Sequence, residues 1–207
     1  MVLSGSRRLF FSRDSRSGGT WFISDDNKRV AVILNGAFQK HEVRPAYRKS
    51  RGLVLIDLFE AEQFVTAFET FSLEDIEPFQ ILYADNHELS RLVWDGANKH
   101  ILELNPNHAY IFSSITLYNE EAMKLRERWF SDFIRNNKNI RRQDLFDFHL
   151  NHQNNDPVNG LRILREDQHK THNLSQIEIS AEGGIYTYLD LAKKVPTEQW
   201  ISRAQPI

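Results

Sequence analysis

Arg48 and Arg51 flank Ser50 at the predicted start of a helix, after a long loop that contains Pro45 and several basic side chains. A guanidinium group can hold a carboxylate or a phosphate through two parallel hydrogen bonds. Loops of this length in compact domains are often functional. The two arginines could therefore anchor an anionic ligand. The alternative is that they pair with Asp or Glu side chains at the protein surface.

Histidines recur at a spacing of three residues, as His149 and His152 and again as His169 and His172. On a helix this spacing places two imidazoles on one face, which a metal site would require. The sequence fixes no third ligand, and the absence of cysteine removes thiolate ligands. The chain also lacks a glycine-rich phosphate loop and a nucleophile-elbow motif. We predict neither a metal site nor a cofactor.

The composition is that of a globular protein, with 41% apolar and 12% aromatic residues in 207. This length predicts a single domain over residues 1–207, with a core over about 9–191 and a loosely packed tail over 196–207. The net charge is -2 with both signs interspersed, which argues against a nucleic-acid partner. No apolar run is long enough to span a membrane and no signal peptide is recognisable, so we predict a cytoplasmic protein.

The pattern of apolar residues predicts strands in three groups that are separated by pairs of helices. The predicted strands are 21–24, 29–34, 79–84, 88–94, 99–104, 110–115, 173–180 and 185–191, and the predicted helices are 53–59, 61–71, 119–135 and 142–150. Asn119 is the expected N-cap of the third helix. Strand groups interrupted by helix pairs indicate an α+β fold.

Three segments occur in a recognisable order: Gly18-Gly19-Thr20-Trp21, then Asn35-Gly36 at a strand end, then Ser50-Arg51-Gly52 at a helix start. Together with Trp94-Asp95-Gly96 and Ser113-Ser114-Ile115 further on, this order resembles the NRDE family, also called the Transport and Golgi organization 2 family, in its bacterial branch. The resemblance implies a single NRDE-like domain. It also implies an Ntn-hydrolase-like αββα sandwich of mainly antiparallel sheets with flanking helices.

The resemblance also suggests site residues. An Asn amide commonly contributes to the oxyanion hole of Ntn hydrolases, so Asn35 is the candidate oxyanion donor. Trp21, Asn35, Arg48, Arg51 and Ser113 are the candidate ligand-binding residues. Asn-Gly is equally an ordinary turn pair, and Trp21 is more simply a core aromatic residue.

The chain departs from the family pattern at its start. Family members begin with Met-Cys followed by an Asn-Arg-Asp-Glu motif, whereas Met1 is followed here by Val2 and no cysteine occurs. We therefore expect a fold that is incomplete at the N-terminus, without a catalytic residue, and self-association through the exposed sheet edge. The chain alone is predicted to be an inactive, non-catalytic protein of small-molecule binding or trafficking type. The alternative is an N-terminal-cysteine hydrolase of an amide substrate when the protein is full length.

Overall fold

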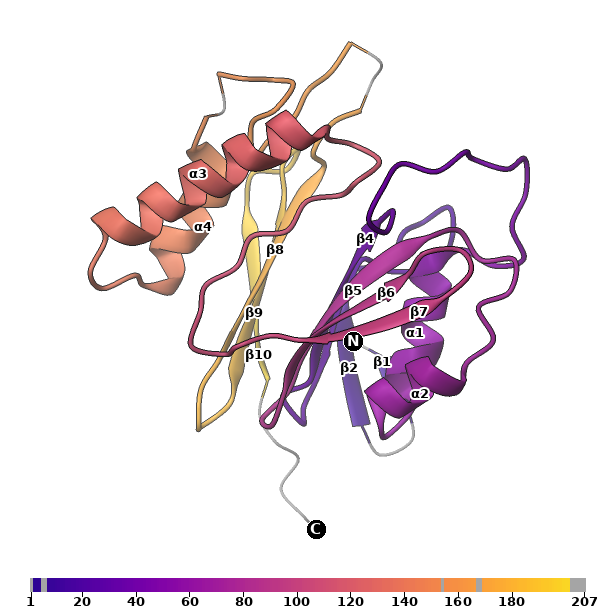
Figure 1. The fold of residues 1–207 in the computed structure, drawn as a ribbon. Helices are drawn as coiled ribbons and strands as arrows, with labels where there is room; N and C mark the ends of the chain where they lie inside the picture. The colour runs from indigo at the N-terminus through magenta and orange to yellow at the C-terminus, as the bar shows by residue number, and fades with distance from the viewer. Residues whose placement is uncertain (1, 5–6, 154, 167–168, 202–207) are drawn as a thin grey trace. The chain divides into compact units, whose positions relative to one another are not determined.

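A computed structural model describes residues 2–4, 7–153, 155–166 and 169–201 of the chain (Figure 1). The chain divides into two compact units. Of the described residues, the first unit comprises those within 2–108 together with Ser113–Leu117, and the second comprises Ala109–Phe112 and those within 118–201. Each unit contains one antiparallel sheet and one pair of helices.

The sheet of the first unit has seven strands, which lie side by side in the order of the sequence. They are β1 (Val2–Ser4), β2 (Arg7–Phe11), β3 (Phe22–Asp25), β4 (Val30–Asn35), β5 (Phe79–Ala84), β6 (Leu89–Trp94) and β7 (Lys99–Glu103). Every neighbouring pair is antiparallel. Only the β4–β5 connection contains helices.

The pairing of β3 with β4 brings the Thr-Trp segment beside the Asn-Gly segment. Phe22 lies opposite Val32, and the peptide N–H of Ile33 donates to the carbonyl oxygen of Trp21 at 3.0 Å. The tight turn between the strands is completed by Lys28, which has a φ of 66°. This register places Asn35 at the end of β4, directly opposite Phe79 of β5.

Two helices, α1 (Arg51–Glu60) and α2 (Phe64–Thr70), cover one face of this sheet (Figure 1). Their buried side chains pack against alternate strand residues in one apolar core, which includes Leu55, Phe68 and Ile81. The second helix was predicted from residue 61. It starts three residues later because Ala61 is extended and ends α1, with its N–H bonded to the carbonyl oxygen of Leu58.

A buried ion cluster joins the β3–β4 turn to the C-terminal end of α1. The Asp25 carboxylate is fully buried and lies 2.8 Å from Arg29 Nε and 3.5 Å from Arg7 Nη1. Arg29 donates to the carbonyl oxygens of Phe59 at 2.9 Å and Ala61 at 2.7 Å. Helix ends leave such carbonyl groups without intrahelical partners. Arg29 therefore caps the helix, and Asp25 balances the buried positive charge.

The second unit contains α3 (Glu120–Asn136) and α4 (Arg142–Asn151) with a three-stranded sheet of β8 (Asn173–Ile179), β9 (Gly184–Asp190) and β10 (Pro196–Ile201). The predicted N-cap is confirmed, because Asn119 Oδ1 accepts the N–H of Ala122 at 2.8 Å. The predicted strands 173–180 and 185–191 are confirmed as β8 and β9, and they pair as a hairpin. Arg142 at the start of α4 contacts the sheet through Thr187 Oγ1 and Glu198 Oε1, at 2.9 and 2.8 Å.

Two local predictions differ from the structure. Residues 110–115 form no strand; the N–H of Ile115 instead donates to the carbonyl oxygen of Asn35 at the end of β4. Residues 196–201 were placed in a loosely packed tail, but they pair with β9 as β10, and Ile201 is buried. The first difference arises because the partner of Ile115 is distant in sequence, whereas β10 continues the sheet beside the strand directly before it.

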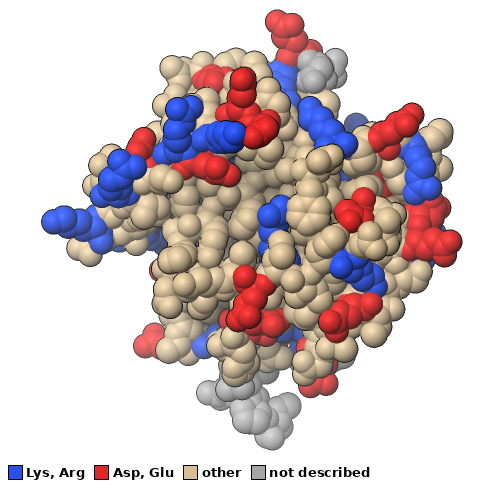
Figure 2. All heavy atoms as spheres, viewed as in Figure 1, with Lys and Arg blue, Asp and Glu red and all other residues tan. Residues whose placement is uncertain are grey.

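The fold is thus α+β with antiparallel sheets and flanking helices, as predicted. Each unit supplies one β layer and one helix pair, which are the elements of an αββα arrangement. Within the described ranges, no helix is both long and apolar enough to cross a bilayer. Acidic and basic side chains intermingle on the face shown in Figure 2.

We expect Asp25→Asn to lower the free energy of unfolding by about 3–5 kcal/mol, because it leaves buried guanidinium groups without a counter-charge. Urea unfolding followed by circular dichroism would measure the change. Asp132→Asn is the matched control, since the Asp132–Arg135 pair is more than half exposed on both sides and should contribute less than about 1 kcal/mol. Equal effects of the two substitutions would contradict the role assigned to the cluster.

Candidate functional site

The end of β4 is fixed by backbone contacts on both sides. The carbonyl oxygen of Asn35 accepts the N–H of Ile115 at 3.0 Å and the hydroxyl of Ser114 at 3.1 Å. Gly36 follows with a φ of 80°, and its N–H donates to the carbonyl oxygen of Pro78 at 3.0 Å. A Cβ on Gly36 would lie 2.9 Å from the Cβ of Ile115, so this turn requires glycine.

The Asn35 side chain has an unsatisfied polar atom. Its Oδ1 is buried and has no hydrogen-bond partner among the described residues. A buried polar atom without a partner costs about 1–3 kcal/mol, and native proteins contain few of them. Such a group at a rigid strand end is a good candidate for contact with a bound molecule.

The glycine-rich segments of the sequence pattern meet beside this strand end. A Cβ on Gly19 would lie 2.6 Å from the backbone carbon of Gly52, and the N–H of Thr20 donates to the Gly52 carbonyl oxygen at 3.2 Å. The backbone at the start of α1 therefore packs directly against the segment before β3. Thr20 is buried, and its hydroxyl lies 2.9 Å from the carbonyl oxygen of Ser12, so it is not presented as a nucleophile.

Arg51 reaches the same strand end from α1. Its Nη1 donates to the carbonyl oxygen of Pro78 at 3.2 Å, and its Nη2 lies 3.0 Å from Glu77 Oε2. Glu77 Oε1 in turn lies 3.2 Å from His41 Nε2. Burial lowers the pKa of Arg51, and the negative charge of Glu77 opposes that shift. Arg51 thus has protein partners for its charge and for its hydrogen bonds.

Arg48 contacts a different part of residues 72–78, which lie in the connection between α2 and β5. It donates to the carbonyl oxygens of Glu74 at 3.1 Å and Ser72 at 2.7 Å, while Arg44 pairs with Asp75 at 3.0 Å. Hydrogen bonds and an ion pair therefore hold the basic loop between β4 and α1 against the connection between α2 and β5. Its arginines have a structural role in addition to the ligand-anchoring role that the sequence suggested.

The remaining two predicted residues are placed differently from Asn35. Trp21 is 46% exposed, so it is not a core aromatic residue. Ser113 contributes its carbonyl oxygen to Gln80 Nε2 at 3.4 Å, whereas the adjacent Ser114 supplies the hydroxyl that contacts Asn35. Sequence analysis missed Ser114, His41 and Glu77 as parts of this site. The Ser-Ser pair was the only signal for Ser114, and nothing in the sequence singled out the other two.

Comparison with known families decides the identity of the chain. The family model described as Transport and Golgi organisation 2 matches residues 2–190. The chain belongs to the Transport and Golgi organisation 2 family. No curated protein matches it.

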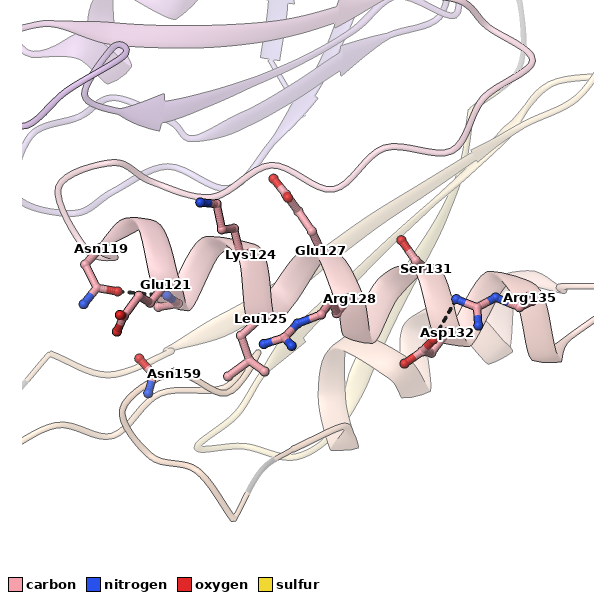
Figure 3. Close-up of a pocket in the computed structure, with 11 residues that line it drawn as sticks. Asn119, Glu121, Lys124, Leu125, Glu127, Arg128, Ser131, Asp132, Arg135 and Asn159 are labelled. Carbon is pink, nitrogen blue, oxygen red and sulfur yellow. Dashed lines mark hydrogen bonds and ion pairs between the residues drawn. The ribbon is translucent and has the colours of Figure 1, made fainter.

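This family member also has an open groove of about 1050 Å³ along α3 in its second unit (Figure 3). Lys124, Glu127 and Ser131 project to one side of the helix, and Leu125 and Arg128 project to the other. The lining is rich in charges of both signs, and Arg135 is paired with Asp132 at 2.9 Å. Small-molecule sites are usually enclosed and mostly apolar. This groove therefore has the character of a solvated surface rather than a selective pocket.

His149 and His152 both lie against the ring of Phe148, at centroid distances of 5.5 and 4.8 Å. Burial lowers the pKa of both histidines. The hydrogen bond from His149 Nδ1 to the carbonyl oxygen of Leu145, at 3.0 Å, opposes the shift for His149. Across the described residues, no group of three or more His, Cys, Asp or Glu side chains could hold a metal ion. The pair is best explained as neutral imidazoles packed among aromatic rings.

We expect Asn35→Leu to leave the free energy of unfolding unchanged or to raise it by about 1 kcal/mol, because it removes a buried polar atom that has no partner. Gln80→Leu is the matched control. Gln80 is also buried, but its amide accepts from Arg91 Nε at 2.9 Å and donates to Ser113, so its loss should cost about 1–3 kcal/mol. Equal destabilisation by both substitutions in urea unfolding would show that the Asn35 side chain is structural.

We expect His149 to lower the free energy of unfolding as the pH falls below about 6.5, the ordinary pKa of histidine, whereas Asp25, whose pKa burial raises to about 7, acts in the opposite direction over the same range. The unfolded chain takes up a proton at His149 that the folded chain binds less readily, so unfolding is favoured by acid, by at most about 1.4 kcal/mol per pH unit. Urea unfolding between pH 7.5 and 5.5 would measure this slope. His149→Leu should reduce it, whereas replacing the exposed His87 should not; an unchanged slope in His149→Leu would refute the assignment.

Proposed function

We propose that this member of the Transport and Golgi organisation 2 family is a non-catalytic protein that binds a small polar molecule at the end of β4. The observation that carries the proposal is the buried Oδ1 of Asn35, which has no partner among the described residues. The surrounding backbone is held by Ser114, Ile115 and Pro78, so the amide belongs to a preorganised strand end. Preorganised polar groups give small-molecule sites their specificity.

The side chains around Asn35 favour binding over covalent catalysis. The 207 residues include no cysteine and therefore supply no thiol nucleophile. The hydroxyl of Ser114 is directed to the Asn35 carbonyl oxygen, and the buried Thr20 hydroxyl lies 2.9 Å from the carbonyl oxygen of Ser12. An activated nucleophile needs an adjacent base within hydrogen-bond reach. Neither hydroxyl has this arrangement.

The alternative function is hydrolysis of a C–N bond by an Ntn-type enzyme with an N-terminal cysteine. The Asn35 amide supports this alternative, because in the opposite amide orientation its NH₂ group would point where Oδ1 now lies and could stabilise an oxyanion. The intact mass of the protein purified from its source would show whether such a residue is present. If it is, replacing that cysteine by alanine must abolish turnover for the hydrolase assignment to hold.

We further propose that the protein is cytoplasmic and associates with itself through an edge of the seven-stranded sheet. β1 and β7 are the end strands of that sheet, and unpaired strand edges readily recruit another strand. Light scattering after size-exclusion chromatography would give the mass in solution. A monomeric mass at all concentrations would exclude self-association without affecting the ligand-binding proposal.

We expect a set of small amides, carboxylic acids and amines to include molecules that bind the wild-type protein saturably in ligand-observed NMR. Asn35→Leu should weaken that binding at least tenfold, which corresponds to about 1.4 kcal/mol for one lost polar contact. The control is His87→Leu, which alters an exposed side chain that has no assigned role at the site and leaves the Asn35 amide intact. Binding that survives Asn35→Leu unchanged would place the ligand elsewhere and overturn the proposal.

A further inference from the structure

The outer side of β7 is an open strand edge at one end of the seven-stranded sheet. β7 is the last strand of that sheet, and among the residues that the structure describes no strand pairs with its outer side. The N–H of Leu104 donates to the carbonyl oxygen of Leu89, which fixes the phase of the ladder between β7 and β6. Every second residue of an antiparallel strand bonds to the same neighbour, so the even-numbered residues face β6. The peptide groups of Lys99, Ile101 and Glu103 therefore point outward.

Ile101 is the last member of a row of apolar side chains that crosses this sheet. The row runs through the paired residues Ile33, Ile81, Leu92 and Ile101. The first three side chains are buried, whereas Ile101 is 40% exposed. Burial of exposed apolar surface by an added strand stabilises such an edge. The row thus ends at the position where one further strand would continue it.

Charged residues flank Ile101 symmetrically along this edge. Lys99 precedes it by two residues and Glu103 follows it by two, so all three side chains project from the same face of the strand. Lysine on an edge strand normally discourages pairing. Here the sequence is complementary to itself, because an antiparallel copy centred on Ile101 sets each Lys99 opposite Glu103 of the other chain. Opposite charges in directly opposed positions stabilise a pair of strands.

The direction of the peptide groups agrees with this register. The outward residues of one copy face the outward residues of the other, and each opposed pair can exchange two N–H···O bonds. A shift by two residues would place a charged side chain opposite Ile101 and leave the second charge unmatched. Lys99 can take part because its ammonium group has three donors, of which two contact the carbonyl oxygens of Glu69 and Phe71 at 2.6 Å.

We propose that β7 is the self-association surface of this protein, and that it pairs with β7 of a second copy in antiparallel orientation, with Ile101 opposite Ile101. The two seven-stranded sheets then form one continuous sheet around a two-fold axis, as an isologous interface requires. This inference rests on the proposed function, of which self-association is a part, and it names the edge and the partner strand. The opposite edge, β1, offers only three residues against the five of β7. One strand pair is smaller than a standard interface, so the dimer is reversible.

Amide hydrogen exchange tests the pairing directly when it is measured below and above the dissociation constant that sedimentation velocity gives. In ¹⁵N-labelled wild-type protein, the outward amides of Lys99, Ile101 and Glu103 should be protected at least fivefold more at the higher concentration. The inward amides of His100 and Leu102 bond to β6 and should be protected equally at both concentrations.

Charge reversal tests the complementarity of the edge. Glu103→Lys should raise the dissociation constant of the dimer at least tenfold, because lysines then oppose each other at both ends of the strand pair. Lys99→Glu should do the same through opposed glutamates. A mixture of the two variants should associate again, since each lysine of one chain then meets a glutamate of the other. Glu127→Lys, the same charge change at an exposed residue of α3, is the matched control and should leave the dissociation constant unchanged.

Ile101→Pro provides a test that does not depend on charge. It removes the central outward N–H but no hydrogen bond to β6, and an edge strand tolerates proline at such a position. The dissociation constant should again rise at least tenfold. Circular dichroism would check that each variant folds, and the exchange pattern of the wild-type amides decides alone if a variant does not.

Unchanged dimerisation in both Glu103→Lys and Ile101→Pro would overturn the inference and assign self-association to another edge. A wild-type protein that stays monomeric would overturn the inference and the proposed self-association together. Ligand binding at Asn35 is measured separately, so neither result affects it.

Discussion

The close approach of two backbone segments, at Gly19 and Gly52, is the constraint on which the site depends. The space between them is too small for a single Cβ atom, because one placed on Gly19 would lie 2.6 Å from the Gly52 carbon. This contact places the first turn of α1 against Gly19 and Thr20, which precede β3. Arg51, which precedes Gly52, is thereby held where its guanidinium group reaches Pro78 and Glu77. Without the two glycines, neither the helix start nor the strand end at Asn35 could occupy its place.

The arginines of the first unit act mainly on backbone carbonyl groups. Arg29 caps the C-terminal end of α1, and Arg48 and Arg51 bind carbonyl oxygens of the 72–78 connection. The planar guanidinium group suits this task because it presents several N–H donors in fixed directions. Helix ends and turns are the places where carbonyl groups lack partners. The basic loop is therefore part of the scaffold that positions the site, beyond any contact that it makes with a ligand.

Two of the arginines that follow β4 are paired with acidic side chains. This differs from the anion-binding site that a cluster of arginines suggests at first, because the charges of Arg44 and Arg51 are neutralised by Asp75 and Glu77. A site for an uncharged polar ligand is compatible with a binding protein. It is also compatible with an amide hydrolase once a nucleophile is supplied, which links the two functional proposals through one ligand chemistry.

The sequence by itself determined the local elements and the family. Apolar periodicity predicted α1, α3, the central strands and the β8–β9 hairpin, because these depend on residues that are close in sequence. The ordered glycine, Asn-Gly and Arg-Gly segments identified the Transport and Golgi organisation 2 family. Asn35 was also singled out in this way. Tertiary structure alone decided that Ser114, His41 and Glu77 join it, that residues 110–115 form no strand, and that residues 196–201 pair with β9. The contacts of Ser114 with Asn35 and of His41 with Glu77 join positions far apart in the chain, and sequence periodicity carries no information about which distant segments will become neighbours. β10 pairs with the strand directly before it, but its mostly exposed residues carry no apolar alternation that would have predicted a strand.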